Sequence, residues 1–361
     1  MMRRRTRFLE TVPLWLAAAV TIATYAAPTF GQFTGLTSTA EHAAAIVVYP
    51  YITADTGVDT VIQLSNTGGA PARVHCFYED TSGHCANNPA RPCTADDACG
   101  GFPCLQQRLL FDFAIQLTPG QPVEWRVGVG ASGSPIIGQI PPRPVFVGLL
   151  RCFLVDASGI PVQADALEGV ATVESVSSGS PPQIDTVKYN AIGIPSVLND
   201  GSSAADPTLQ LGGPNAQYAA CPNLTTFGHF FEGAVDPVSA QSRIQTDLVL
   251  VPCSVDYATN QPTSVMVHYV TFNEFAQRLG TSKRLTAQQV GSLTSIHPTV
   301  FDVGTQGTLA GHTELIRIDG GILALAIQRE IVGQSVVSSA AFAVQHRGTN
   351  IAPDLIVLQP F

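Results

Sequence analysis

Apolar and polar residues alternate in short stretches along most of the chain. In the segment 57–80, Ile62 and Leu64 fall on one face of an extended strand, and Val74 begins a second alternating run. Between them lies Asn66-Thr67-Gly68-Gly69, a composition typical of a tight turn. The pattern therefore predicts a β-hairpin over 57–80, ending near a cysteine-rich stretch.

A second alternating run covers 109–117 and is followed by Thr118-Pro119-Gly120-Gln121, with Pro and Gly in the positions of a type II turn. Strand, turn and strand in this order are common in secreted immunoglobulin-like sandwiches. Further strand-like segments are 46–52, 145–156, 167–176, 184–194, 246–254, 264–272, 315–318, 322–327, 336–345 and 355–358. The best helical candidate is Asn273–Ser292, in which Gly280 limits the expectation to one or two short turns.

Composition supports a chain built mainly of β-strands. Hydrophobic residues make up 45% and charged residues 12%, and the 32 Gly and 26 Pro follow no period, which favours many short strands joined by turns. We predict one or two antiparallel β-sandwich domains of immunoglobulin-like character. The expected division is a domain over 32–198 with a disulfide-rich insertion at 81–106, and a second β-rich domain over 199–361.

The first 31 residues have the composition of a signal peptide. Four arginines lie within residues 3–7, an apolar run follows at 12–27, and cleavage is expected after Ala26 or Gly31. Retention of this segment as an uncleaved anchor stays open. We therefore expect a secreted, periplasmic or cell-surface protein, with no transmembrane segment in the mature chain.

Eight cysteines in an exported chain indicate disulfides. Cys221 and Cys253 flank one compact segment, and Cys76 and Cys152 lie on strong strands, so these two pairs are favoured. A short loop from Cys76 to Cys85 is the rival pairing. The full set is Cys76, Cys85, Cys93, Cys99, Cys104, Cys152, Cys221 and Cys253. With the favoured pairs, the four cysteines of the insertion bond among themselves.

The insertion contains two neighbouring acids, Asp96 and Asp97, between closely spaced cysteines. Calcium prefers several oxygen ligands, so these acids are weak calcium candidates, and a solvated turn is the simpler interpretation. A zinc site made of His84, Cys85 and Cys93 is the less favoured alternative to disulfides.

Several motifs together resemble a group of exported β-rich proteins of environmental bacteria, some with C-T-x-D-x-D-C type cysteine insertions. The motifs are VYPYI, DTVIQLSNTGGAPARVHCFYED, LTPGQPVEW, YNAIG, ACP, LVPCS and FNEFAQR, within residues 46–285, and CTADDACGGFPC in the insertion. No activity is established for that group. The resemblance implies only that these motifs belong to one exported β unit.

Charge and motif content exclude several function classes. The chain carries 18 Lys and Arg against 27 Asp and Glu, a formal net charge of −9, which argues against nucleic acid as a partner. The run Gly128–Gly133 fits G-x-G-x-x-G, but Pro135 follows where a dinucleotide site needs a helix. We expect no cofactor and no catalytic motif.

The leading hypothesis is an exported, non-catalytic structural or binding protein, with a protein or glycan partner outside the cell. The first alternative is a secreted hydrolase or carbohydrate-binding accessory that uses Glu274, Glu232 and Asp80, together with the aromatic segment 227–231. The second alternative is calcium-dependent adhesion through the cysteine-rich insertion. The sequence leaves the ligand, the disulfide connectivity and the oligomeric state open.

Overall fold

All described residues belong to one compact unit, which runs from Gly35 to Phe361. The computed structural model describes residues 38, 41–93, 99–105, 108–137, 139–176, 183–236, 238, 240–261, 263–333, 335–347 and 353–359. The predicted signal peptide, residues 1–31, lies outside the described residues.

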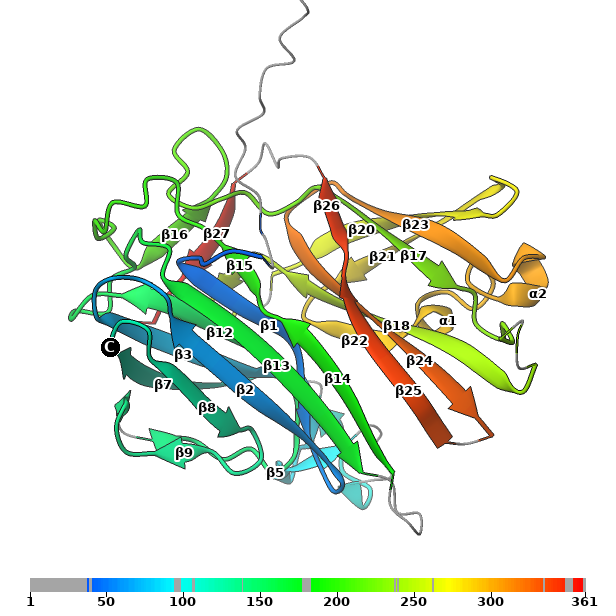
Figure 1. The fold of residues 1–361 in the computed structure, drawn as a ribbon, viewed down its shortest axis with the longest axis horizontal. Helices are drawn as coiled ribbons and strands as arrows, with labels where there is room; N and C mark the ends of the chain where they lie inside the picture. The colour runs from blue at the N-terminus through cyan, green and yellow to red at the C-terminus, as the bar shows by residue number, and fades with distance from the viewer. Residues whose placement is uncertain are drawn as a thin grey trace, which may run out of the picture. The chain divides into compact units, whose positions relative to one another are not determined.

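Two antiparallel sheets are built from the first half of the chain (Figure 1). Sheet A has the strand order β14 (Ile184–Asn190), β13 (Leu167–Val176), β2 (Val58–Asn66), β8 (Pro122–Arg126). Sheet B has the order β10 (Ile136–Ile137), β7 (Leu109–Leu117), β3 (Ala72–Asp80), β12 (Phe146–Val155), β1 (Ile46–Ala54), β15 (Ile192–Ile194).

Two more antiparallel sheets come from the second half. Sheet C has the order β22 (Gln289–Ser292), β18 (Ser242–Pro252), β24 (Ile322–Val332), β25 (Ser335–Ala343). Sheet D has the order β21 (Arg278–Leu285), β20 (Val265–Asn273), β23 (Ala310–Arg317), β17 (Leu224–Phe230), β26 (Gln345–Arg347). Figure 1 shows β14 of sheet A beside β25 of sheet C, where the Ser339 hydroxyl donates to Asp185 at 2.6 Å.

Small sheets and short helices complete the described structure. The first small sheet is β16 (Thr208–Leu211), β27 (Asp354–Val357), β19 (Val255–Asp256), and the second is β5 (Asn88–Cys93), β4 (Gly83–Cys85), β6 (Cys104–Leu105). A third pairs β11 (Gln139–Ile140) with β9 (Ala131–Ser132). The helices α1 (Leu293–Ile296) and α2 (Val303–Gln306) are single turns.

The prediction of a mainly β chain is confirmed, but the prediction of immunoglobulin-like sandwiches is wrong. Strands account for 59% and helices for 3%, and the arrangement corresponds to a five-bladed β-propeller with small sheets. In a two-sheet sandwich each sheet keeps one polar outer face. Here the run Ile46–Tyr49 of β1 is buried on both faces of sheet B.

Sheet C is likewise covered on both sides. Val249 and Val251 of β18 belong to a core shared with sheets A and B, whereas Leu248 and Leu250 belong to a second core shared with sheet D. Residues on both sides of position 198 therefore contribute to the first core, while the domain boundary predicted there stays a prediction.

The predicted hairpin over 57–80 is also wrong in its pairing. Both strands form, but β2 pairs with β13 and β8 in sheet A, and β3 pairs with β12 and β7 in sheet B. The turn is thus an arch between sheets. Asn66 holds it through a bond from the Gly68 amide to its Oδ1 (2.9 Å) and a bond from its Nδ2 to the Ala70 carbonyl (2.9 Å).

The turn at 118–121 forms a second arch, from β7 in sheet B to β8 in sheet A. Gly120 has a φ of 70°, as the type II position requires. The two arches bond to each other, because the Gly120 amide donates to the Asn66 carbonyl at 2.7 Å and the Asn66 amide donates to the Gln121 carbonyl at 3.2 Å.

The helix predicted within Asn273–Ser292 is wrong. The segment forms the turn and second strand of the β20–β21 hairpin, followed by β22. Asn273 Oδ1 accepts from the Phe275 and Gln277 amides, at 3.0 and 2.9 Å, and so closes the turn. In β21, Leu279 and Leu285 face the second core at even spacing, which is the period of a strand.

His229 of β17 is buried in the second half, where its ring contacts Phe231 and Phe301. Nδ1 lies 3.3 Å from the Phe230 carbonyl, so Nδ1 carries the proton, and Nε2 accepts from the Thr313 hydroxyl at 2.7 Å. Burial, with a smaller repulsion from His312, lowers the pKa of His229 to about 4 from its ordinary 6.5.

Because His229 has a lowered pKa in the folded chain, we expect the protein to lose stability in acid. The unfolded chain takes up a proton near pH 6.5, whereas the folded chain does so only near pH 4, so stability falls as the pH drops between these values. The free energy of unfolding should fall by about 3 kcal/mol over that range. Denaturant titrations of His229→Gln should show a flatter pH profile. The exposed His42, changed to Gln, is the control, and a wild-type slope in His229→Gln would contradict the expectation.

Candidate functional site

Both favoured disulfides are confirmed. Cys76 bonds to Cys152 across the neighbouring strands β3 and β12, and Cys221 bonds to Cys253. Within the insertion Cys85 bonds to Cys99, so the rival pairing of Cys76 with Cys85 is wrong. The side chains of Cys93 and Cys104 lie outside the description. The three disulfides among the described residues indicate that the chain folds in an oxidising environment.

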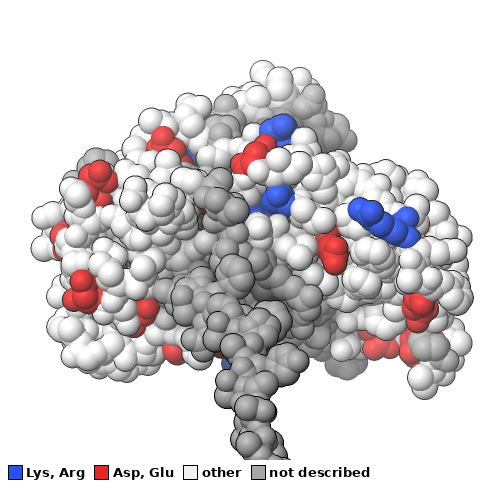
Figure 2. Space-filling view, turned by 90° about the horizontal axis from the view of Figure 1, so that it is seen from above, with Lys and Arg blue, Asp and Glu red and all other residues white. Residues whose placement is uncertain are grey.

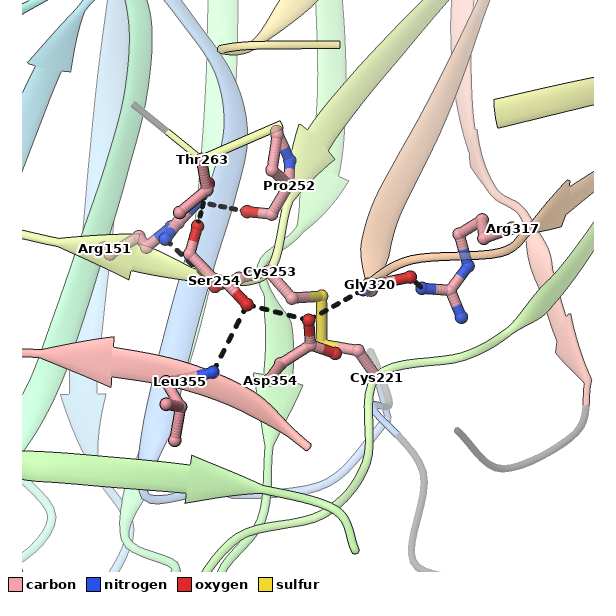
Figure 3. Close-up of a disulfide and its surroundings, with 11 residues drawn as sticks. Arg151, Cys221, Pro252, Cys253, Ser254, Thr263, Arg317, Gly320, Asp354 and Leu355 are labelled. Carbon is pink, nitrogen blue, oxygen red and sulfur yellow. Dashed lines mark hydrogen bonds between the residues drawn. A yellow bond between two sulfur atoms is a disulfide. The ribbon is translucent and has the colours of Figure 1, made fainter. Parts of the chain in front are cut away.

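The Cys221–Cys253 disulfide lies beside a buried carboxylate, Asp354 (Figure 3). The Ser254 hydroxyl and the Gly321 amide donate to Asp354, at 2.8 and 2.7 Å. Two sulfurs and a carboxylate lie within 4.8 Å of one another, but sulfurs joined in a disulfide are not thiolate ligands for a metal. Cys85 is likewise joined in a disulfide, with Cys99, so it cannot serve as a thiolate ligand in the zinc site considered for His84, Cys85 and Cys93.

The three carboxylates of the hydrolase hypothesis lie in different elements. Asp80 ends β3 and accepts from the Ser82 hydroxyl at 2.6 Å, and its pKa is raised because burial outweighs this bond. Glu232 accepts from the Thr294 hydroxyl and amide at α1. Glu274 is exposed in the β20–β21 turn. The calcium candidates Asp96 and Asp97 lie outside the described residues.

The aromatic segment 227–231 contributes to the interior. Phe227 and Phe231 are 3% and 0% exposed, so they pack in the core and offer no open platform for a sugar ring.

A buried group of charges joins sheet B to the start of the second half. Glu79 of β3 lies 3.3 Å from Arg151 of β12 and 3.1 Å from Arg108, and it accepts from the Tyr257 hydroxyl at 2.7 Å. Burial, together with the Glu79 carboxylate, raises the pKa of Tyr257, which keeps the phenol neutral and able to donate. We call these four residues the Glu79 network.

Arg151 ties the network to the backbone beside a disulfide. Its guanidinium donates to the carbonyls of Pro252 and Cys253, at 2.6 and 3.4 Å. Arg108 donates to Asn260 Oδ1 at 3.0 Å and to the Asp256 carbonyl at 3.3 Å. The network therefore holds one buried carboxylate against two guanidinium groups, and Arg108 is its member at the surface.

Arg108 also lines a groove of about 420 Å³. We call it the cationic groove; its lining residues are Thr81, Arg108, Val147, Lys283, Arg284, Leu285, Thr286, Ala287, Gln288, Gln289 and Val290. Thr81 and Arg108 stand at the two ends of the cysteine-rich insertion. The groove thus lies at the base of that insertion, opposite the segment that joins β21 to β22.

Three cations and no acid line this groove, although acids outnumber bases in the chain. Arg284 lies 3.9 Å from Asp319, and both side chains are about half exposed. Among the described residues, the structure gives the Lys283 side chain no ion-pair or hydrogen-bond partner. On the face of the molecule drawn in Figure 2, Lys and Arg lie in a few small spots, one of which adjoins acidic side chains.

Gln288 fixes the wall of the groove. Its Nε2 donates to the carbonyls of Pro50 in β1 and Gly148 in β12, and its Oε1 accepts from the Thr81 hydroxyl at 2.7 Å. The segment 286–288 is thereby bonded to sheet B and to the start of the insertion. Its position is set by side-chain bonds to backbone groups, which makes the groove a formed feature of the fold.

No family model, curated protein or solved structure matches the chain. Within the part of the chain that the structure describes, no helix has the length and apolar composition needed to cross a membrane. The sequence prediction gave no binding role to Arg108 or to the segment 283–290, which it placed within the predicted helix. The one available signal was the scarcity of lysine, since only Lys188 and Lys283 occur in the chain.

Proposed function

We propose that the chain is a non-catalytic binding protein that works outside the cytoplasm, secreted, in the periplasm or at the cell surface. The observation that carries this proposal is the cationic groove, fixed by Gln288 at the base of a disulfide-held insertion. A concave site with a few convergent polar groups is the usual form of a ligand site.

The chemistry of the acids supports binding over hydrolysis. Glycoside hydrolysis needs two carboxylates facing each other across a cleft. Asp80 accepts from Ser82, Glu232 accepts from the first turn of α1, and Glu274 is exposed in the β20–β21 turn. Glu79 is neutralised by two arginines and is enclosed, so it serves structure.

The test is a steric block of the groove. Thr286 is exposed on the groove wall, so Thr286→Trp should fill the space and lower binding by about tenfold or more, the effect of losing about 1.4 kcal/mol of contact. The mature protein is applied to an array of neutral and acidic oligosaccharides and peptides. Thr186→Trp, at an exposed position on β14, is the matched control.

Two results would contradict the proposal. One is turnover, seen as released products when the mature protein is incubated with the glycans and peptides of the array. The other is an array that binds nothing, or binds Thr286→Trp as well as it binds the wild type.

A further inference from the structure

We infer that the cationic groove takes a glycan that bears carboxylate groups, an acidic oligosaccharide of the uronic-acid type. This inference rests on the proposed function, since it names the ligand class of the same groove. It joins two observations: the cations that meet there, and the polar side chains between them.

The charge balance favours an anion. Glu79 is shared between Arg108 and Arg151, so one of these two positive charges has no matching carboxylate within the Glu79 network. Lys283 adds a further positive charge at the groove. Its side chain is half-buried on the inward face of β21, which it shares with Leu279 and Leu285.

An anionic partner would stabilise the charge of this half-buried lysine. A charged hydrogen bond at a partly buried site is stronger than one in open water, because the surroundings screen it less. The nearby acids reduce the field only in part. Asp319 faces Arg284 at 3.9 Å in solvent, and the half-buried Asp256 accepts from the Thr259 hydroxyl at 2.6 Å.

The remaining lining favours a sugar over a peptide. Thr81, Thr286 and Gln289 place hydroxyl and amide groups along the groove, and the exposed apolar lining is confined to small or branched side chains. Peptide sites anchor large apolar side chains in pockets. A sugar instead offers hydroxyls along its length, and carboxylates at intervals match Arg108 and Lys283, which both line the groove.

The experiment compares two ligands with the same sugar chain, in which methyl esters replace the charged carboxylates. Titration calorimetry is run with tetragalacturonate and with its fully methyl-esterified form, at low and at physiological salt. We expect the acid to bind at least about tenfold more tightly than the ester, and salt to weaken only the acid. Lys283→Gln should remove most of this difference, while Lys188→Gln, on β14, should leave it unchanged.

The outcomes separate this inference from the proposed function. Equal affinity for acid and ester, with both lost in Thr286→Trp, would overturn the inference and leave the binding groove standing. A hexaglutamate peptide that competes as well as the glycan would overturn it in favour of an acidic peptide. Failure of tetragalacturonate to bind would also overturn it, and the proposed function would then be judged by the array alone. Retention of the acid preference in Lys283→Gln would contradict the role of that lysine.

Discussion

Replacing Glu79 with glutamine is expected to lower the free energy of unfolding by about 3–5 kcal/mol, the usual result of removing one partner from a buried ion pair. Glu79 is 3% exposed, and its carboxylate is the acid that faces both Arg151 and Arg108 in the Glu79 network. The amide would leave Arg151, which is 2% exposed, with its charge unmatched. Equilibrium denaturation by urea measures the change.

The control for this variant is Glu168→Gln, an exposed carboxylate on β13, where a change below about 0.5 kcal/mol is expected. Arg108→Gln should cost less than Glu79→Gln, because Arg108 reaches solvent and its loss leaves Glu79 paired with Arg151. A Glu79→Gln protein as stable as the Glu168→Gln control would show that the network does not hold the halves together.

The second large effect is expected from the Cys76–Cys152 disulfide. Changing both cysteines to alanine should lower the free energy of unfolding by about 4 kcal/mol, because the bond closes a long loop in the unfolded chain. The sequence separation is 76, against 14 for Cys85–Cys99. Both sulfurs are fully buried between β3 and β12, so their removal also leaves unfilled space in the core.

The Cys85→Ala/Cys99→Ala protein is the matched comparison. Its shorter loop predicts a loss of about 3 kcal/mol, with no added cost in the main core. Denaturation without reductant ranks the two proteins. If the pair in the insertion proved the more costly to remove, the assignment of the main structural role to Cys76–Cys152 would be wrong.

Strand positions were the part of the fold that the sequence could predict. The alternation of Ile62 and Leu64, and that of β7, identified strands close to their observed bounds. Alternation shows which residues share a face, but it does not name the neighbouring strand. The turns at 66–69 and 118–121 are equally compatible with a hairpin and with an arch between sheets, and only packing of the two sheets decides between them.

The sequence indicated in part which strands are buried on both faces. The unbroken apolar runs in β1, β12 and β24 are the mark of strands covered on both sides, and the prediction of a two-sheet sandwich did not use that consequence. The helix predicted in 273–292 failed for a related reason. Ala276 and Leu279 suggested a helical face, but Ala276 has a φ of 56° in a turn, which a helix excludes.

The candidate site could not be predicted from local patterns. Thr81, Arg108 and the segment 283–290 are far apart in the sequence and meet only because Gln288 bonds to β1 and β12. The disulfides were easier to predict, because Cys76 and Cys152 lie on strong strands and Cys221 and Cys253 flank one compact segment. A rare residue type, lysine in this chain, was the one local feature that marked the groove.

Hydrogen–deuterium exchange of the mature protein, with and without tetragalacturonate, tests most directly that binding occurs in the cationic groove. The account predicts slower exchange in the segment 283–290 and next to Arg108. Exchange in sheet A and in the remainder of sheet C should be unchanged. Protection confined to other surfaces, such as the groove beside Glu168, would contradict it. So would identical exchange at ligand concentrations that saturate the calorimetric signal.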